Sequence, residues 1–550
     1  MQYKTLLLLL LVLSLPAIAQ QKIYETNRAY NQGDWITYAA TRFVRYVSLG
    51  NTFVYFASSG GITRYNYFAN QWNYPWTVSN GLASNEVYLV AEDANTGFVW
   101  AVTEKSISRY EPAAEIWYNE FFDEMGMIQA PVQSIGFDGV NVIVVDSRDN
   151  WFKSHNQFFN FQQTQPALND HIKWFGRRDQ RSGLPHFFMD SEFSAYTFND
   201  AGQEIRDHEL RTWPVTTWVR DKWGNLWIGT WGLGAGRGDL NTNRLTLLPF
   251  GLWDDTVDDI GKDESSFWVG GMQDHDDYTG ITRWFGVQKP PVYYEPHLIS
   301  GFSNPEITSI DLNERFVFFG TLGGVAFYDR EQEYWRTLRR VNNLSDDIVN
   351  DVVLDSDFLW IATEGGASSL NLSSIRPDSA DIKQILPSRY KELLVYDVDS
   401  HGDSLWLGTE YGLYLYHKQK QAGFFIGDID FINTRVFAVS AFDSELWFAT
   451  DEGVGCLDTK HHVLKQIPER LHSVPAGIHR ILVAAQSVWV ATDNGVYKYN
   501  RFANRWRHYT RMDGLADNRV YSLYLKGNYI WFGTPKGLTR FYWNSPLRSD

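Results

Sequence analysis

The apolar and polar residues of this chain alternate with the two-residue period of β-strands, and one short cassette recurs along most of its length. The cassette consists of an apolar residue, Trp, another apolar residue, Gly or Ala, and Thr, and a Gly and an apolar-aromatic run follow. Clear copies lie at 226–230, 359–363, 405–409, 446–450, 488–492 and 530–534. The copies are spaced by about 42 residues, which is typical of a repeat architecture.

Each repeat contains four short strand patterns separated by polar or glycine-containing turns. In the last full repeat they occupy 480–484, 488–492, 496–500 and 506–509, and Asp493-Asn494-Gly495 is a strong hairpin signal between the second and the third. Four-stranded, aromatic-rich units of this length are typical of the blades of a β-propeller. The pattern therefore predicts an all-β fold, a β-propeller with about twelve four-stranded blades.

The count of twelve depends on the central aromatic residue of each cassette. Weaker copies surround Tyr55 and Ile143, and a further one is expected near Phe187 or Phe188, so the third and fourth blades are degenerate. The clear anchors are Trp100, Trp227, Trp268, Phe318, Trp360, Trp406, Trp447, Trp489 and Trp531.

The two ends of the repeat region complement each other. The last repeat has only three strand patterns, whereas residues 34–38 precede the first repeat and resemble the fourth strands of other repeats. We therefore expect this N-terminal strand to complete the last blade, because ring closure removes free sheet edges.

Propeller rings usually hold four to eight blades, so twelve blades predict two rings. Pro290-Pro291 marks a candidate seam. The expected division is a signal peptide at 1–19, a first propeller at 20–297 with blades 1–6, and a second at 298–550 with blades 7–12. The closing strand means that the rings may interleave, and 6+6, 7+5 and a single ring all stay open.

The N-terminal sequence indicates where the protein is located in the cell, and its net charge restricts the partners that it can bind. Lys4, the apolar run 6–15 and Ala17-Ile18-Ala19 form a secretory signal, and no Cys follows the cleavage site. We expect a periplasmic or secreted protein that is not a lipoprotein and has no membrane span. The formal net charge of −16 argues against a nucleic-acid partner. No cofactor is expected apart from the divalent cation considered below.

The sequence pattern of the repeat resembles that of a known family. Residues 512–520 read Met-Asp-Gly-Leu-Ala-Asp-Asn-Arg-Val, residues 80–87 and 343–348 are similar, and 221–225 form the turn before the Trp227 cassette. Over residues 34–545 this is similar to the two-component-regulator propeller repeat of bacteria.

The resemblance implies paired propellers outside the cytoplasmic membrane that sense ligands, often carbohydrates, for attached histidine kinases. Sensors of that family continue into a linking β-domain, a transmembrane helix and a kinase, none of which follows the last repeat here. We therefore expect a free-standing, sensor-like propeller whose partner could be a sensor kinase on another chain.

Turns between second and third strands should share one face of a propeller, and several of them are acidic. Repetition would place their side chains around one mouth, where carboxylates and an aromatic ring could hold a sugar or a cationic peptide. The alternative is that these residues only form solvated turns. The candidate ligand-binding residues are Glu364, Glu410, Tyr411, Asp451, Glu452, Asp493 and Asn494.

Two further sites are candidates. Trp231 lies in a glycine-rich turn, where it could stack on a sugar or form a contact between blades. An insertion in the sixth repeat contains Asp274, His275, Asp276 and Asp277, which could bind a divalent cation, although charged loops are common.

The leading interpretation is a non-catalytic protein that binds a glycan, a peptide or a protein. No Ser lies in a G-x-S-x-G turn, and no catalytic residue can be singled out. The alternatives are a carbohydrate-active lyase or hydrolase with a site in an axial funnel, and a structural or interaction scaffold.

Overall fold

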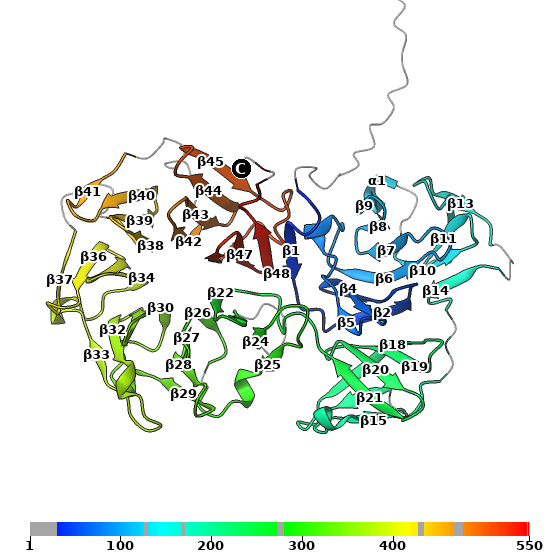
Figure 1. The fold of residues 1–550 in the computed structure, drawn as a ribbon, viewed down its shortest axis with the longest axis horizontal. Helices are drawn as coiled ribbons and strands as arrows, with labels where there is room; N and C mark the ends of the chain where they lie inside the picture. Colours follow the sequence, from blue (N-terminus) through cyan, green and yellow to red (C-terminus); the bar gives the residue numbers. More distant parts are fainter. Residues whose placement is uncertain are drawn as a thin grey trace, which may run out of the picture.

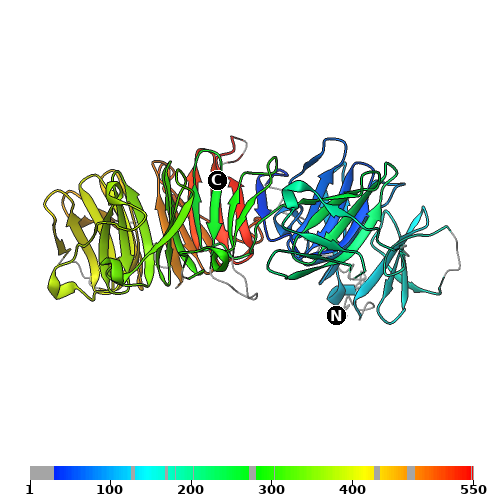
Figure 2. The ribbon, with the colours of Figure 1, turned by 90° about the horizontal axis from the view of Figure 1, so that it is seen from below.

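The fold of the 550-residue chain is taken from a computed structural model, and it consists almost entirely of β-sheets. Figure 1 shows two groups of sheets beside each other, and the side view in Figure 2 separates them clearly. The structure describes residues 30–125, 130–166, 171–179, 181, 183–201, 203–271, 280–302, 304–426, 434–466, 477–546 and 548.

The larger group is a closed ring of seven four-stranded blades, which we call the C-terminal ring. Its innermost strands pack in succession from β22 to β46, and β46 packs back against β22. The blades are β22 (Asp259–Lys262), β23 (Phe267–Gly270), β24 (Ile281–Trp284) and β25 (Val292–Tyr294); β26 (Ile307–Leu312), β27 (Phe316–Thr321), β28 (Gly324–Asp329) and β29 (Tyr334–Leu338); β30 (Val349–Asp355), β31 (Phe358–Thr363), β32 (Gly366–Asn371) and β33 (Ile382–Gln384); β34 (Val395–His401), β35 (Ser404–Thr409), β36 (Gly412–His417) and β37 (Ala422–Phe425); β38 (Val436–Phe442), β39 (Glu445–Thr450), β40 (Gly453–Asp458) and β41 (Val463–Leu464); β42 (Ile478–Val483), β43 (Ser487–Thr492), β44 (Gly495–Asn500) and β45 (Arg505–Tyr509); and β46 (Ser522–Lys526), β47 (Tyr529–Thr534), β48 (Gly537–Tyr542) and β1 (Trp35–Tyr38).

The N-terminal strand closes the last blade, as the sequence predicts. β1 pairs antiparallel with β48, from Trp35 opposite Phe541 to Tyr38 opposite Leu538. The rings of Trp35 and Phe541 are stacked, with their centroids 3.9 Å apart. Backbone pairing and aromatic stacking therefore join residues that are about 500 positions apart in the chain.

The tryptophan of each cassette explains how neighbouring blades pack. Trp268 in β23 contacts Phe319 of the next blade, with ring centroids 6.1 Å apart. Trp531 in β47 contacts Phe267 at 4.2 Å, and this pair joins the last blade to the first. Large flat side chains fill the space between twisted sheets, so the cassette recurs because every blade faces another one.

The smaller group, which we call the N-terminal lobe, contains the other four sheets. Its innermost strands pack in the order β18, β2, β6 and β10. The sheets are β2 (Val44–Leu49), β3 (Phe53–Ser58), β4 (Gly61–Asn66) and β5 (Gln71–Trp72); β6 (Val87–Glu92), β7 (Val99–Thr103), β8 (Ser106–Glu111) and β9 (Ile116–Phe121); β10 (Val132–Phe137), β11 (Asn141–Asp146), β12 (Trp151–His155), β13 (Gln162–Thr164) and β14 (Lys173–Gly176); and β15 (Phe188–Met189), β16 (Thr197–Asn199), β17 (Glu204–Arg206), β18 (Thr212–Arg220), β19 (Asn225–Thr230), β20 (Ala235–Asp239) and β21 (Arg244–Leu248).

Helices contribute little to the described part of the chain. They are α1 (Phe122–Met125) and the 3-10 turns η1 (Val78–Asn80), η2 (Ser191–Phe193), η3 (Pro296–Leu298), η4 (Arg340–Asn342), η5 (Leu372–Ser374) and η6 (Ser388–Tyr390).

The degenerate repeats lie where the N-terminal lobe stops being a regular ring. Ile143 replaces the cassette tryptophan, and it packs with Trp151 and Ile172, which belong to its own sheet and the segment before β14. On the other side, Phe187 and Phe198 cover the sheet that contains β18. Each end sheet is thus covered by its own chain, and β10 and β18 do not pack as neighbouring innermost strands do.

Two expectations need correction. The described residues form eleven sheets, close to the expected number of about twelve blades, but the copy expected near Phe187 or Phe188 is not a blade. The residues around Phe188 form only β15, a parallel strand beside β21. The sheet β22–β25 belongs by its contacts to the C-terminal ring. The two groups of sheets therefore separate between β21 and β22, not near residue 298.

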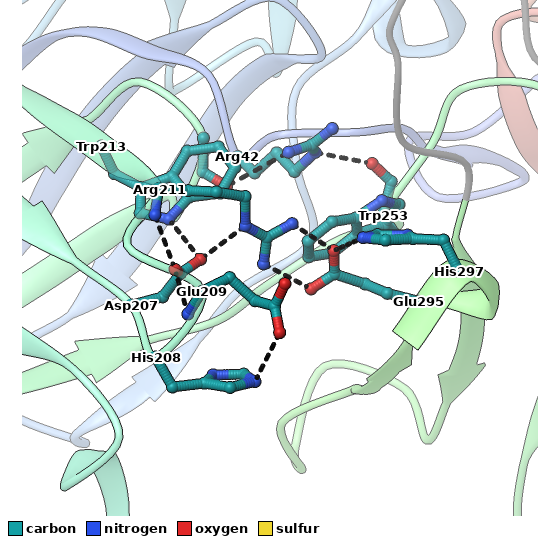
Figure 3. A network of polar contacts seen from close by, with 10 residues as sticks. Arg42, Asp207, His208, Glu209, Arg211, Trp213, Trp253, Glu295 and His297 are labelled. Atoms are coloured by element: carbon teal, nitrogen blue, oxygen red, sulfur yellow. Dashed lines mark hydrogen bonds and ion pairs between the residues drawn. The ribbon is translucent and has the colours of Figure 1, made fainter. Parts of the chain in front are cut away.

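The N-terminal lobe is inserted into the C-terminal ring, between β1 and β22. The two connecting segments run side by side, and the backbone N–H of Leu252 donates to the carbonyl of Ala39 at 3.0 Å. Figure 3 shows Arg42 in this junction, where its Nε donates to the carbonyl of Trp253 at 2.8 Å. Nearby, Arg211 of the lobe forms an ion pair with Glu295 of the ring.

We predict that Trp35→Ala destabilises the protein by about 3–5 kcal/mol, because it leaves a cavity and removes the stack that closes the ring. Calorimetric melting of the variant should show a clearly lower melting temperature. Phe502→Ala, at a side chain that is 80% exposed, is the matched control and should melt like the wild type. Equal melting of both variants would contradict this role of β1.

Candidate functional site

Five of the seven innermost strands of the C-terminal ring share a β-bulge near their first residue. In β30, for example, Val349 pairs with Thr363 and Asp351 with Ala362, so Asn350 lies unpaired between them. A bulge changes the direction of a side chain, and here it turns one residue of each strand toward the mouth of the ring. The bulged residues are Thr308, Asn350, Tyr396, Phe437 and His479.

These residues form the floor of a funnel on the ring axis. Asp258 and Tyr521 occupy the corresponding positions before β22 and β46, so each of the seven blades contributes one residue. The cavity has a volume of about 420 Å³, within the range of small-molecule sites. Its lining is Thr256, Asp258, Thr308, Asn350, Tyr396, Asp397, Phe437, His479, Arg480, Arg519, Tyr521 and Pro535.

Contacts between blades hold the floor in place. Thr308 donates its hydroxyl to the carbonyl of Val349 at 2.7 Å, and Asn350 donates its amide to the carbonyl of Val395 at 2.7 Å. On the other side of the floor, the rings of His479 and Tyr521 meet edge to face with their centroids 5.2 Å apart. The floor is therefore prearranged, with aromatic faces and hydrogen-bonding groups at one level.

An arginine closes the axis directly below the floor. Arg480, the residue after the bulged His479, lies 2.6 Å from a carboxylate oxygen of Asp397 and 3.1 Å from one of Asp351. Asp259 contributes a third carboxylate at 3.8 Å. One guanidinium thus joins the innermost strands of four blades, and geometry of this kind is needed to stabilise charges away from water.

The carboxylates on the axis have altered pKa values. Burial, followed by the neighbouring Asp351, raises the pKa of Asp397 well above its ordinary value, and burial raises that of Asp259. Further along the axis, burial raises the pKa of Asp311 to about 7 and that of Asp399 to about 6. Burial opposes the charge of Arg480, but the three carboxylates raise its pKa above the ordinary value.

The acidic turns lie around the rim of this funnel, and three of their carboxylates have partners. Glu410 accepts the backbone N–H of the residue before β34 at 3.1 Å. Asp451 binds Arg435 through two contacts, at 2.7 and 3.2 Å, and Asp493 forms a hydrogen bond with His479 at 2.8 Å. These side chains therefore hold the wall and the floor rather than lining the cavity themselves.

The other candidates lie further away. The turn side chains of Glu364, Tyr411, Glu452 and Asn494 are exposed and do not line the cavity. Trp231 belongs to the N-terminal lobe, where its ring lies 5.1 Å from that of Phe43. The candidate metal ligands Asp274, His275, Asp276 and Asp277 lie outside the described residues.

Sequence reasoning missed the floor of the funnel. Tyr396, Phe437 and His479 each follow the first apolar residue of an innermost strand, and they share no residue type. The usable signal is therefore their position in the repeat, which becomes visible only when the register of the first two strands is known.

Comparisons with known proteins give weak sequence similarity. No family model matches the chain. A stretch of 290 residues, 48% of this chain, is 23% identical to histidine kinase P4 of Formosa agariphila, and the match covers 21% of that protein. This match confirms the resemblance of the repeats to those of two-component regulators, but the chain spans only about a fifth of the length of this relative.

Two of the solved structures that match this chain are the following. One is PorZ, a surface component of the type-IX secretion system of Porphyromonas gingivalis, with 14% identity, 91% of this chain and 74% of that chain covered, and a TM-score of 0.47. Another is the extracellular domain of a putative one component system of B. thetaiotaomicron, with 13% identity, coverage of 92% and 76%, and a TM-score of 0.46. Within the described residues, no helix has the length and hydropathy that a membrane span requires.

We predict that the stability of the protein falls as the pH rises from about 4 to 7. The folded state keeps the proton of Asp311 up to a pKa of about 7, whereas the unfolded chain loses it near 3.8, so only the folded state is protonated in this range. In Asp311→Asn, the fall in the free energy of unfolding between pH 4 and pH 7 should be smaller by about 1–3 kcal/mol. The measurement is the melting temperature at pH 5 and pH 8.

The wild type should melt at a higher temperature at pH 5 than at pH 8, and the difference should shrink in Asp311→Asn. Asp378→Asn, at an exposed aspartate, is the control and should keep the wild-type difference. An unchanged difference in Asp311→Asn would show that this carboxyl does not titrate as its burial implies.

Proposed function

We propose that this protein is a periplasmic or secreted, non-catalytic binding propeller of the sensor type, and that the funnel of the C-terminal ring binds a glycan. The observation that carries the proposal is the floor itself. Tyr396, Phe437 and Tyr521 offer ring faces for a sugar, and Asn350 and Thr308 lie at the same level as hydrogen-bonding groups. Flat apolar faces beside oriented polar groups are what a small polyhydroxylated ligand requires.

The charges around the funnel favour an uncharged ligand. Arg435 is paired with Asp451, Arg480 with Asp397 and Arg519 with Asp517, and His479 is hydrogen-bonded to Asp493. Each of these arginines therefore has a carboxylate partner within the protein. A neutral saccharide therefore fits the funnel better than a cationic peptide or an acidic ligand does.

The same pairings favour binding over catalysis. Arg480 is fixed by three carboxylates, so it cannot take part in proton transfer without breaking a contact. A lyase or hydrolase stays the alternative, because histidine, arginine and tyrosine side chains do meet at the axis. A scaffold without a ligand would not need a preformed cavity on the ring axis.

The sensor part of the proposal concerns a partner. Two proteins to which this chain is similar are a histidine kinase and an extracellular domain of a putative one component system. We infer by analogy that ligand binding here is read by a kinase on another chain. This inference rests on the family resemblance and not on the geometry of the funnel.

The test is a screen of the mature protein against neutral oligosaccharides, followed by calorimetric titration of each hit and analysis of the products. We predict that Tyr396→Ala and Phe437→Ala each weaken binding at least tenfold, which corresponds to about 1.4 kcal/mol. Phe502→Ala should bind like the wild type, and the saccharide should be recovered intact.

The possible results separate the alternatives. Binding that survives both floor substitutions, but is lost when Glu410, Asp451 and Asp493 are replaced together by Ala, would place the ligand on the rim. Cleavage of the saccharide would support the enzyme. Failure of every neutral saccharide to bind would overturn the proposal.

A further inference from the structure

The N-terminal lobe uses the same bulge as the C-terminal ring. The innermost strands β2, β6 and β10 are each bulged after the first residue, at Arg45, Tyr88 and Gln133, and β18 is bulged further along, at Thr216. Thr216 donates its hydroxyl to the first residue of the next sheet, Val44, at 2.7 Å, as Thr308 does to Val349 in the ring. These four residues are therefore the counterparts of the funnel floor.

Aromatic rings lie beside this second floor and are open to solvent. The guanidinium carbon of Arg45 lies 4.9 Å from the ring centroid of Tyr88 and 5.3 Å from that of Trp231. Tyr88 is 43% exposed and Trp231 is 40% exposed. Glu86 holds Arg45 at 2.6 Å, so the two rings are presented on a fixed support.

The lobe is closed below this floor. Arg181 reaches across the lobe, and its guanidinium donates to the carbonyl of Val47 at 3.0 Å and to the hydroxyl of Thr217 at 2.7 Å. Asp179 binds Arg181 and accepts a hydrogen bond from the hydroxyl of Tyr46 at 2.8 Å. A ligand would therefore rest on a floor and would not enter a channel.

Beside this second floor lies an arginine without a carboxylate partner among the described residues, unlike the arginines around the funnel. Arg177 is exposed, and its Nη1 donates to the side-chain oxygen of Gln133 at 2.9 Å. In the part of the chain that the structure describes, no carboxylate lies within ion-pair distance of Arg177. Arg177, Gln133 and Tyr88 line one cavity of about 760 Å³. Its lining also contains two carboxylates, Asp123 and Glu104, and Glu104 pairs with Lys105.

We infer that the N-terminal lobe carries a second saccharide site, specific for an acidic sugar. The anionic group of the sugar binds the guanidinium of Arg177, and a sugar ring packs on Tyr88, which lines the same cavity. Arginine suits this role because its planar fork matches a carboxylate or a sulfate. The inference does not depend on the funnel, whose cationic groups are paired and which is proposed to bind neutral sugars.

The experiment is calorimetric titration of the mature protein at low and at physiological salt with three probes. These are trigalacturonate, which carries only carboxylates, a carrageenan tetrasaccharide, which carries only sulfates, and neutral maltotriose. We expect at least one acidic probe to bind, with an affinity that falls as salt is added, because a charge contact is screened.

Two variants test the residues. Arg177→Gln should weaken binding of the acidic probe at least tenfold and remove most of its salt dependence, and Tyr88→Ala should weaken binding several-fold at either salt concentration. Lys222→Ala removes an exposed cation from another turn of the lobe and should bind the probe like the wild type. Melting curves of all the variants establish that they fold.

The two sites can fail separately. Tyr396→Ala should leave the acidic probe bound, whereas Arg177→Gln should leave binding to the funnel intact. The inference is overturned if neither acidic probe binds, if Lys222→Ala is as damaging as Arg177→Gln, or if binding of the acidic probe is lost only in Tyr396→Ala.

Discussion

The pairing of β1 with β48 is the interaction on which the rest of the structure depends. It supplies the fourth strand of the last blade, and Trp531 of the same blade packs against the first blade of the ring. Because β1 precedes the N-terminal lobe in the chain, the same pairing makes the lobe an insertion in the ring. Closure of the ring and placement of the lobe are thus one event.

A small irregularity of the backbone creates the sites. The bulge at the start of each innermost strand turns one side chain toward the mouth, and the regular strands around it keep that side chain in place. The bulged side chains are only partly buried, and the five bulged positions of the ring carry Thr, Asn, Tyr, Phe and His. The same backbone framework can therefore present different side chains in the C-terminal ring and in the N-terminal lobe.

The sequence was sufficient for the parts of the fold that depend on local pattern. The cassette around Trp489 predicts a second strand, and the segment 34–38 predicts the closing strand, because both are visible as apolar patterns. The division between the groups of sheets was misplaced, because Pro290-Pro291 lies just before β25, inside a blade of the ring. The acidic turns were visible in the same way, whereas the floor of the funnel depends on strand register, which residue types do not reveal.

The parallel course of the two connecting segments has a consequence for how such proteins diversify. Because Ala39 and Leu252 are hydrogen-bonded neighbours, the chain leaves the ring and returns to it at nearly the same place. A gene segment that encodes the residues between them could be exchanged for another without altering the C-terminal ring. The ring would keep its structure, and the inserted lobe could change to bind a different ligand.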